Sequence, residues 1–300
     1  GLAGLTIAWE KAQVSFVLGH DFAMPLLILT AGVFAVLLGL YLTKIVRFRT
    51  AVTAELGHPI HLNFFPTISI SLLLLAIATL PHWPGAAGVL WVLGTGLHLF
   101  LTLYVMGVWM HHEHFEIHHL NPAWFIPVVG NVLVPIAGAQ LGFVELSWFF
   151  FSVGILFWLV LLVIIMYRTL FHSPLAERLM PTFFILIAPP AVGFLAYVQL
   201  SGGIDAFARV LFYSGLFLTL LLATQARRFL RLPFYLSWWA YSFPLAAMTV
   251  ATLVMYQRTG VLAFAAIGWV LLTLVSLVVI YLLARTARAV AASRICVPAH

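Results

Sequence analysis

Charged residues and cysteine are both scarce in this sequence, and each shortage excludes a class of protein. Only 7% of the 300 residues are charged, whereas 64% are hydrophobic and the mean hydropathy is +1.13. A soluble domain carries about 25% charged residues, so this chain has too few to cover a water-facing surface. The single cysteine, Cys296, excludes a disulfide framework and a cysteine-rich metal site. The composition therefore predicts an integral membrane protein.

Uninterrupted apolar segments recur along the chain at lengths that suit a membrane. A helix needs about 20 apolar residues to cross the hydrocarbon core. We expect ten spans: an N-terminally truncated first helix, then 22–43, two within 59–112, and finally 117–144, 146–167, 179–203, 210–226, 232–257 and 259–284. The loops are too short to fold separately, so residues 1–300 form one transmembrane domain. Because open sheet edges are not tolerated in lipid and barrel-like alternation is absent, the predicted fold class is an all-α integral membrane protein.

The basic residues support this count of spans. If ten helices alternate in direction, eleven of the fourteen Lys and Arg fall on one side: Lys44, Arg47, Arg49, Arg168, Arg178, Arg227, Arg228, Arg231, Arg285, Arg288 and Arg294. The positive-inside rule then places both termini in the cytoplasm, with the protein in the inner (cytoplasmic) membrane. The formal charge of +6 is explained by these helix ends and does not indicate nucleic-acid binding.

Prolines inside the spans follow a pattern of their own. Apart from Pro25 near the start of the second span, the interior prolines occur in the third, fifth, seventh and ninth spans: Pro66, Pro127, Pro135, Pro189, Pro190 and Pro244. Proline frees a backbone carbonyl and kinks a helix, which is tolerated at membrane depth only against protein or a water-filled cavity. Membrane helices carry extra proline in general, but the restriction to alternate spans favours five helical hairpins around a central pore. Each hairpin would pair a kinked inner helix with a straight outer one.

Ionisable groups are nearly absent from the predicted helical cores. We expect no Asp, Glu or Lys there, and His98 is the main titratable group near mid-membrane. A proton-coupled carrier needs a buried carboxylate relay and a cation pathway needs acidic rings, so an anion or a neutral solute fits better. The candidates for polar pore lining are Thr67, Ser69, Asn131, Thr182 and Ser242. Each of them can instead bond to its own helix or to a neighbouring one.

A dense group of histidines follows the fourth span: His111, His112, His114, His118 and His119. Imidazoles and carboxylates at this density can ligate zinc or iron, and segment 114–119 resembles one histidine box of a membrane di-iron enzyme. Such an enzyme needs several boxes, and here the other pairing is His58 with His61. We therefore interpret the group as a polar cytoplasmic loop and expect no metal and no cofactor. The hypothesis that His98 binds haem is weaker still, because no second histidine inside the membrane could take the opposite axial position.

Phe243 lies inside the ninth span beside the kinking Pro244. There it would point into the axis and block it, although a lone phenylalanine in a membrane helix more often faces lipid or packs against a neighbour.

Three motifs, taken in order and with their spacing, resemble the tellurite-resistance/dicarboxylate transporter family, which includes the bacterial TehA and the plant slow (S-type) anion channels. They are 121–127 (Asn-Pro-Ala-Trp-Phe-Ile-Pro), 188–190 (Ala-Pro-Pro) followed by Ala196-Tyr197, and 239–243 (Trp-Ala-Tyr-Ser-Phe). Segment 58–66 is similar to the beginning of the family's third helix. The resemblance spans the chain, with the first helix cut short, while the histidine group departs from it.

The resemblance implies a homotrimer in which each protomer holds its own pore inside five helical hairpins. It also implies that a phenylalanine of the ninth helix occludes the pore, and Phe243 matches that position. The family conducts small monovalent anions such as chloride and nitrate, and some members are described as malate, sulfite or tellurite transporters.

From the residues and the resemblance together, we predict a gated anion channel and not an enzyme, with small inorganic anions and the lipid bilayer as its partners. Helix dipoles would favour anions, and a lack of fixed Lys or Arg in the pore would keep their binding weak. Two alternatives stay open. One is a secondary transporter or exporter of C4-dicarboxylate, sulfite or tellurite, and the other is a membrane metalloenzyme built on the histidines.

Overall fold

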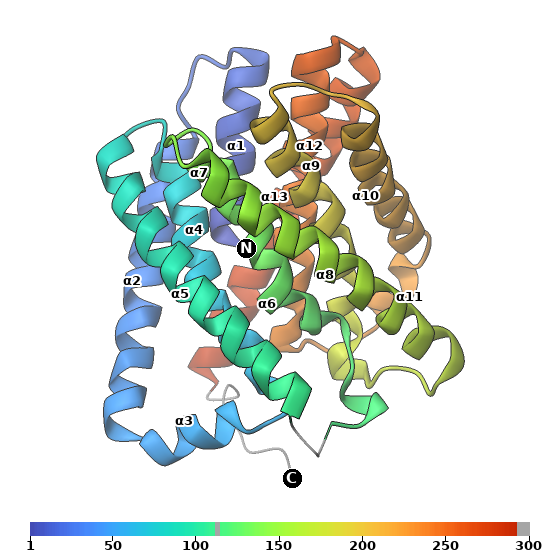
Figure 1. Cartoon of the computed structure of the whole chain (residues 1–300). Helices are drawn as coiled ribbons and strands as arrows, with labels where there is room; N and C mark the ends of the chain where they lie inside the picture. Colours follow the sequence, from blue (N-terminus) through green and yellow to red (C-terminus); the bar gives the residue numbers. More distant parts are fainter. Residues whose placement is uncertain (112–114, 293–300) are drawn as a thin grey trace.

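The protein is an all-helical bundle in the computed structural model, which describes residues 1–111 and 115–292; these residues contain no β-strand (Figure 1). Eight helices in this part of the chain are long and apolar enough to cross a membrane. They are α2 (Ala23–Arg47), His61–Thr79, α5 (Pro84–His111), α8 (Val144–Phe171), Glu177–Ser201, α10 (Ala206–Thr224), Leu236–Thr259 and α13 (Leu262–Ala291).

The other two expected spans are present as shorter helices. The first is α1 (Leu2–Phe16), with 15 residues, and the fifth is the apolar helical segment Pro122–Gly138. The structure therefore contains eight helices of membrane length among its described residues, where the sequence predicted ten spans.

The proline-bearing spans are each built from a 3₁₀ and an α-helical part. They consist of η1 (His61–Phe64) and α4 (Thr67–Thr79); η3 (Pro122–Phe125), α6 (Ile126–Val129), η4 (Gly130–Leu133) and α7 (Val134–Gly138); η5 (Glu177–Ile187) and α9 (Ala188–Ser201); η6 (Leu236–Tyr241) and α12 (Ser242–Thr259). By contrast, α2, α5, α8, α10 and α13 are continuous α-helices.

Proline explains where these spans change from one helix type to the other. Pro66 is the N-cap of α4, Pro127 and Pro135 are second in α6 and α7, and Pro244 is third in α12. Pro189 likewise occupies the start of α9. Proline lacks the N–H that would bond back into the preceding turn, but it is tolerated at the start of an α-helix. The chain therefore approaches each proline as a tighter 3₁₀ helix and continues after it as an α-helix.

The proline-bearing spans are more deeply buried than the continuous helices. In the apolar windows of His61–Thr79, Glu177–Ser201 and Leu236–Thr259, 56%, 67% and 83% of the residues are buried. The corresponding shares for α2, α5, α8, α10 and α13 lie between 17% and 33%. The spans that contain the proline breaks therefore lie inside the bundle, and the straight helices form its outer surface.

The inner helices contact one another in a closed ring. α1 contacts α4, α4 contacts α7, α7 contacts α9, α9 contacts α12, and α12 returns to α1. Each inner helix also packs against the outer helix that follows it in the chain, as α4 does with α5 and α12 with α13. This arrangement leaves a central axis that is surrounded by α1, α4, α7, α9 and α12.

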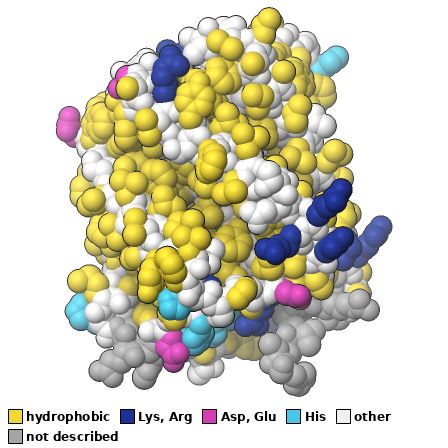
Figure 2. All heavy atoms as spheres, turned by 90° about the vertical axis from the view of Figure 1, so that its right-hand side faces the viewer, with side chains coloured by type: hydrophobic (Ala, Val, Ile, Leu, Met, Phe, Trp, Pro, Cys, Tyr) yellow, Lys and Arg dark blue, Asp and Glu magenta, His cyan; other side chains and the backbone are white. Residues whose placement is uncertain are grey.

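Basic side chains gather toward one end of the bundle. Lys44 and Arg47 lie in the last turn of α2, Arg168 in the last turn of α8 and Arg288 in that of α13. The short helix α3 (Arg49–Leu56) lies at the bottom of the bundle in Figure 1, and the short helix α11 (Ala226–Leu230) follows the lower end of α10. On the face drawn in Figure 2, most Lys and Arg side chains lie in the lower half, and apolar side chains cover most of the remaining surface. The protein is thus a multi-pass membrane protein with one strongly basic end.

Candidate functional site

A cavity of about 480 Å³ lies inside the ring of inner helices, and all five of them contribute side chains to its wall. The lining residues follow a helical spacing: Gly4, Ile7, Lys11 and Val14 on α1, and Phe243, Ala247, Val250 and Val254 on α12. Residues three or four apart lie on the same face of a helix, so each helix presents a single face to the cavity. The cavity therefore follows the axis of the bundle.

The deep end of the cavity lies where α1 and α12 pack closely against each other. Gly4 and Phe243 are the first lining residues of these two helices, and both are at least partly buried. A Cβ atom added to Gly4 would lie 2.9 Å from the Cβ of Ala246 and 3.5 Å from Cδ2 of Phe243. The absence of a side chain at Gly4 therefore allows α12 to come close, with the Phe243 ring beside the Gly4 backbone.

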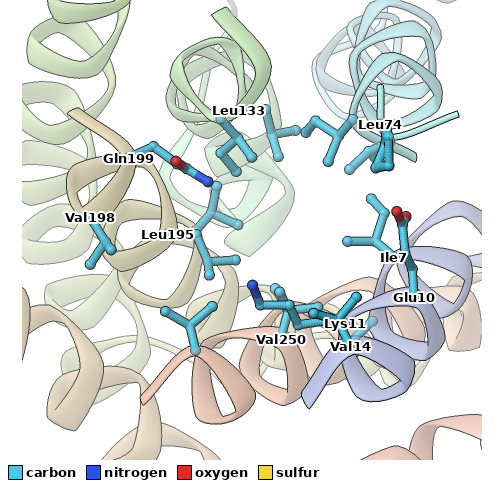
Figure 3. A pocket seen from close by; sticks show the side chains of 18 of the residues that line it. Ile7, Glu10, Lys11, Val14, Leu74, Leu133, Leu195, Val198, Gln199 and Val250 are labelled. Carbon is cyan, nitrogen blue, oxygen red and sulfur yellow. The ribbon is translucent and has the colours of Figure 1, made fainter. Parts of the chain in front are cut away.

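The opposite end of the cavity is open and polar. Its lining includes Glu10, Lys11 and Arg258, together with the glutamines Gln140, Gln199 and Gln257. The three glutamines and Arg258 are exposed, and Glu10 and Lys11 are half-buried. Figure 3 shows Glu10 and Lys11 on α1 among the apolar side chains of the wall. We call this group of six side chains the cavity mouth.

The charged residues of the mouth correct two sequence-based predictions. We expected no Asp, Glu or Lys within the helical cores, yet α1 carries Glu10 and Lys11 on its helical stretch Leu2–Phe16. We also expected no fixed Lys or Arg in the path, yet Lys11 and Arg258 line the cavity. The signal that identifies Lys11 is the spacing of three and four residues that leads from Gly4 through Ile7, and Arg258 likewise follows Val254 by four residues on α12.

The polar side chains expected to line the pore donate hydrogen bonds to backbone carbonyls in this structure. Thr67 donates to the carbonyl of Phe64 at 2.6 Å and is exposed, away from the central cavity. Ser242 is fully buried and donates to the carbonyl of Trp239 at 2.6 Å. Neither side chain belongs to the cavity lining.

Asn131, the third of these residues, stabilises the broken fifth span. Its Nδ2 donates to the carbonyls of Pro127 and Val128 at 3.1 and 3.0 Å and to Oγ1 of Thr102 at 3.2 Å. Thr102, on the outer helix α5, itself donates to the Pro127 carbonyl at 2.8 Å. A buried carbonyl without a hydrogen-bond partner raises the free energy of the folded state, so these bonds stabilise the chain where the fifth span is broken. Ser69 and Thr182 likewise donate to backbone carbonyls, those of Pro66 and Leu179.

The interior prolines also lie behind the cavity wall. Pro66, Pro127, Pro135, Pro189, Pro190 and Pro244 are all buried, and none of them belongs to its lining. They shape the inner helices from behind, while neighbouring residues such as Phe243 reach the cavity.

His98 is fully buried and belongs to a structural contact outside the cavity. Its Nδ1 lies 2.8 Å from Oγ of Ser69 on α4. A Cβ atom at Gly130 would lie 2.1 Å from Cε1 and 2.4 Å from Nε2 of the same imidazole. His98 therefore joins α5, α4 and η4, and it does so through the space that Gly130 leaves open.

The histidines near the basic end form two close pairs, of which one is stacked and one is tilted. The rings of His58 and His61 stack with centroids 4.0 Å apart, and those of His118 and His119 lie 4.1 Å apart. Partial burial, and then the neighbouring His118, lower the pKa of His119, which disfavours protonation of both rings together. Within residues 1–111 and 115–292, no group of three or more His, Cys, Asp or Glu is placed to hold a metal ion. His112 and His114 lie outside the described residues.

Comparison with known proteins gives matches along almost the whole chain. A family model described as SLAC1, voltage-dependent anion channel, matches residues 1–287. The S-type anion channel SLAH3 of Arabidopsis thaliana is 36% identical over 222 residues, which cover 71% of this chain and 34% of the plant protein. The chain thus spans about a third of the length of this relative. The tellurite resistance protein TehA homolog of Haemophilus influenzae is 28% identical over 292 residues, 95% of this chain and 88% of that protein.

Proposed function

The chain belongs to the SLAC1 family of anion channels, which also includes the TehA transporters, and we propose that it is a gated channel for small monovalent anions such as chloride and nitrate. The conduction path would be the axis inside the ring of α1, α4, α7, α9 and α12, and the whole chain would form one channel domain of ten spans in five hairpins. The observation that carries this proposal is the cavity of about 480 Å³ on that axis, which is walled by all five inner helices.

Phe243 would act as the gate. It is the first lining residue of α12, and the cavity extends no deeper than the level of Phe243 and Gly4. Pro244 follows directly, so the ring sits at the change from η6 to α12, where the helix is already broken. Removal of the ring would connect the cavity to the basic end of the bundle.

Electrostatics support an anion as the permeant species. The inner helices all end at the cavity mouth, so the positive, N-terminal ends of their dipoles lie on the Phe243 side. Two of the three charged side chains that line the described cavity are cationic, namely Lys11 and Arg258. By the positive-inside rule, the basic end and both termini would be cytoplasmic, and the mouth would face the outside.

The assembly we propose is a homotrimer with one pore in each protomer. A pore inside a single chain does not need a partner to complete its wall, so assembly would involve only the outer helices. α2 is the least buried of the membrane-length helices, with 17% of its apolar window buried, and is therefore available for contacts with lipid or with a second copy. Mass spectrometry of the protein in detergent, reporting the mass of the intact assembly, tests this proposal.

The gate is tested by recording currents from purified protein in planar bilayers with mixed anions. We expect wild type to be nearly silent and Phe243→Ala to carry large anion currents. The matched control is Phe217→Ala, which removes a ring that is 63% exposed on α10, and it should behave as wild type. Equal small currents in all three proteins would refute the gate.

A secondary carrier is the second candidate, because the TehA homolog that aligns over 95% of this chain is named for tellurite resistance. A carrier of C4-dicarboxylate, sulfite or tellurite should saturate with substrate, whereas an open channel should not. The third candidate, a metalloenzyme, predicts stoichiometric iron or zinc in purified protein, lost in His118→Ala.

A further inference from the structure

Charge is distributed unevenly in the cavity. Among the side chains that line it, only Glu10, Lys11 and Arg258 are ionisable at neutral pH, and all three lie at the mouth. The ion pairs found in residues 1–111 and 115–292 join Lys44 to Glu55 and His118 to Glu116, so these three groups are not paired within 4 Å. Their charges are therefore available to a solute that enters the cavity.

The two neighbouring charges of α1 take different directions. In Figure 3, the Lys11 amine and the Gln199 amide are directed into the opening, and the Glu10 carboxylate lies on the side of Leu74. Arg258 is exposed at the end of α12, and its one described hydrogen bond, to the carbonyl of Gly202, is long at 3.5 Å. Two cationic groups and one carboxylate thus share a small opening.

The backbone at the mouth would by itself repel anions. α1, α4, α7, α9 and α12 all end there, so the negative ends of five helix dipoles surround the opening. Lys11 and Arg258 offset this repulsion. The formal charge of the ionisable lining groups is then +2 from Lys11 and Arg258 and −1 from Glu10, which leaves +1.

We propose that Lys11 and Arg258 bind one small monovalent anion at the cavity mouth, and that Glu10 makes this site selective against divalent anions such as sulfate and dicarboxylates. This proposal rests on the proposed function, in which anions pass through this cavity. A single negative charge neutralises a site of charge +1. A double charge leaves an excess of −1 beside the Glu10 carboxylate and has a larger hydration shell to lose. Neutralisation of Glu10 should therefore favour the divalent anion.

The binding site can be tested without any current. A reporter cysteine, Val14→Cys, lies one helical turn beyond Glu10 on the cavity lining, and Cys296→Ser removes the only native cysteine. The measured quantity is the rate of modification by an anionic relative to a neutral methanethiosulfonate reagent. We expect Glu10→Gln to raise this ratio and Lys11→Gln to lower it, each roughly threefold, as one unit charge about 7 Å away in water would do.

Protection by anions tests the selectivity. At equal ionic strength, chloride should slow the anionic reagent more than sulfate does in the Val14→Cys protein, and Glu10→Gln should remove or reverse this order. The matched control is Glu177→Gln, which removes an exposed carboxylate in the first turn of η5 that does not line the cavity, and it should change nothing. A ratio that is unchanged by Glu10→Gln and Lys11→Gln, or stronger protection by sulfate in the parent, would overturn the proposal.

Currents separate this proposal from the channel function itself. In the Phe243→Ala background, the sulfate-to-chloride permeability ratio should rise with Glu10→Gln and stay constant with Glu177→Gln. If Phe243→Ala conducts but Glu10→Gln changes neither permeability nor modification, the selective site is wrong and the channel stands. If the modification rates follow the charges but no variant conducts, the binding site stands and the gated channel is wrong.

Discussion

Replacement of Gly130 by alanine should destabilise the protein strongly, because the fully buried imidazole of His98 occupies the space that a side chain would need. The new Cβ would lie 2.1 Å from Cε1 and 2.4 Å from Nε2 of His98, and 2.9 Å from Cγ1 of Ile70. Side-chain carbons do not approach so closely, so the imidazole must move away. Its hydrogen bond with Ser69, at 2.8 Å, would then be broken or bent.

The expected loss can be built from two contributions. An extra methyl group in a packed interior lowers the free energy of unfolding by about 1–3 kcal/mol. Loss of the bond between His98 and Ser69 adds about 1 kcal/mol. Gly130→Ala should therefore lower the free energy of unfolding by about 2–4 kcal/mol. Ser69 keeps its bond to the carbonyl of Pro66 at 2.8 Å, so its hydroxyl is not left without a partner.

A double-mutant cycle provides the decisive measurement. His98→Ala removes the imidazole, so the alanine methyl at position 130 then fills empty space, and the double mutant should be more stable than additivity predicts by about 1–3 kcal/mol. The assay is denaturant unfolding of the purified protein in mild detergent, followed by tryptophan fluorescence. Gly96→Ala on α5, where an added Cβ meets nothing within 4 Å, is the control and should not lose stability. Additive effects, or a Gly130→Ala protein as stable as Gly96→Ala, would contradict the contact.

Two further predictions concern α1 and its neighbours. Gly4→Ala should lower the free energy of unfolding by about 1–3 kcal/mol in the same assay, because the new Cβ would lie 2.9 Å from that of Ala246. A Gly4→Ala protein as stable as Gly96→Ala would refute the close approach. Hydrogen bonds from the backbone N–H of Met24 and from the Gln13 side chain lower the pKa of Asp21, so this cap stabilises α2 above the ordinary pKa of aspartate and is lost as pH falls through the depressed value. Hydrogen exchange at the Met24 amide, corrected for intrinsic rates, should accelerate only at that acidic pH. Acceleration that begins at or above the ordinary pKa of aspartate would contradict the cap.

The sequence was sufficient to predict the positions of the eight membrane-length helices found in the described residues, because hydropathy and proline act locally. The expected span 146–167 corresponds to α8, and 179–203 to Glu177–Ser201. Proline removes one N–H wherever it stands, so Pro189 and Pro244 mark the helix breaks directly. The fifth span was predicted too long because Pro127 and Pro135 divide it into short helical pieces, whose limits depend on tertiary contacts.

The site was harder to predict because it depends on which way side chains face. Asn131 is polar and central, but its side-chain amide donates to the carbonyls that the break exposes and does not line the cavity. Glu10 and Lys11 were not identified as cavity residues, because their distance from the bilayer centre depends on how α1 packs against α12. Phe243 was identified from its motif and its position beside Pro244, and its role as a gate stays a prediction.

The five inner helices belong to one chain, and this makes every position in the cavity wall unique. In a pore formed by identical subunits, one substitution is repeated around the axis and changes the charge of the wall by several units at once. Here, a substitution at Glu10 changes the charge of the cavity wall by a single unit and leaves Leu195 and Val250, on other helices, as they were. If anions pass through this cavity as we propose, selection can adjust the pathway in small electrostatic steps, one helix at a time, while the fold stays the same.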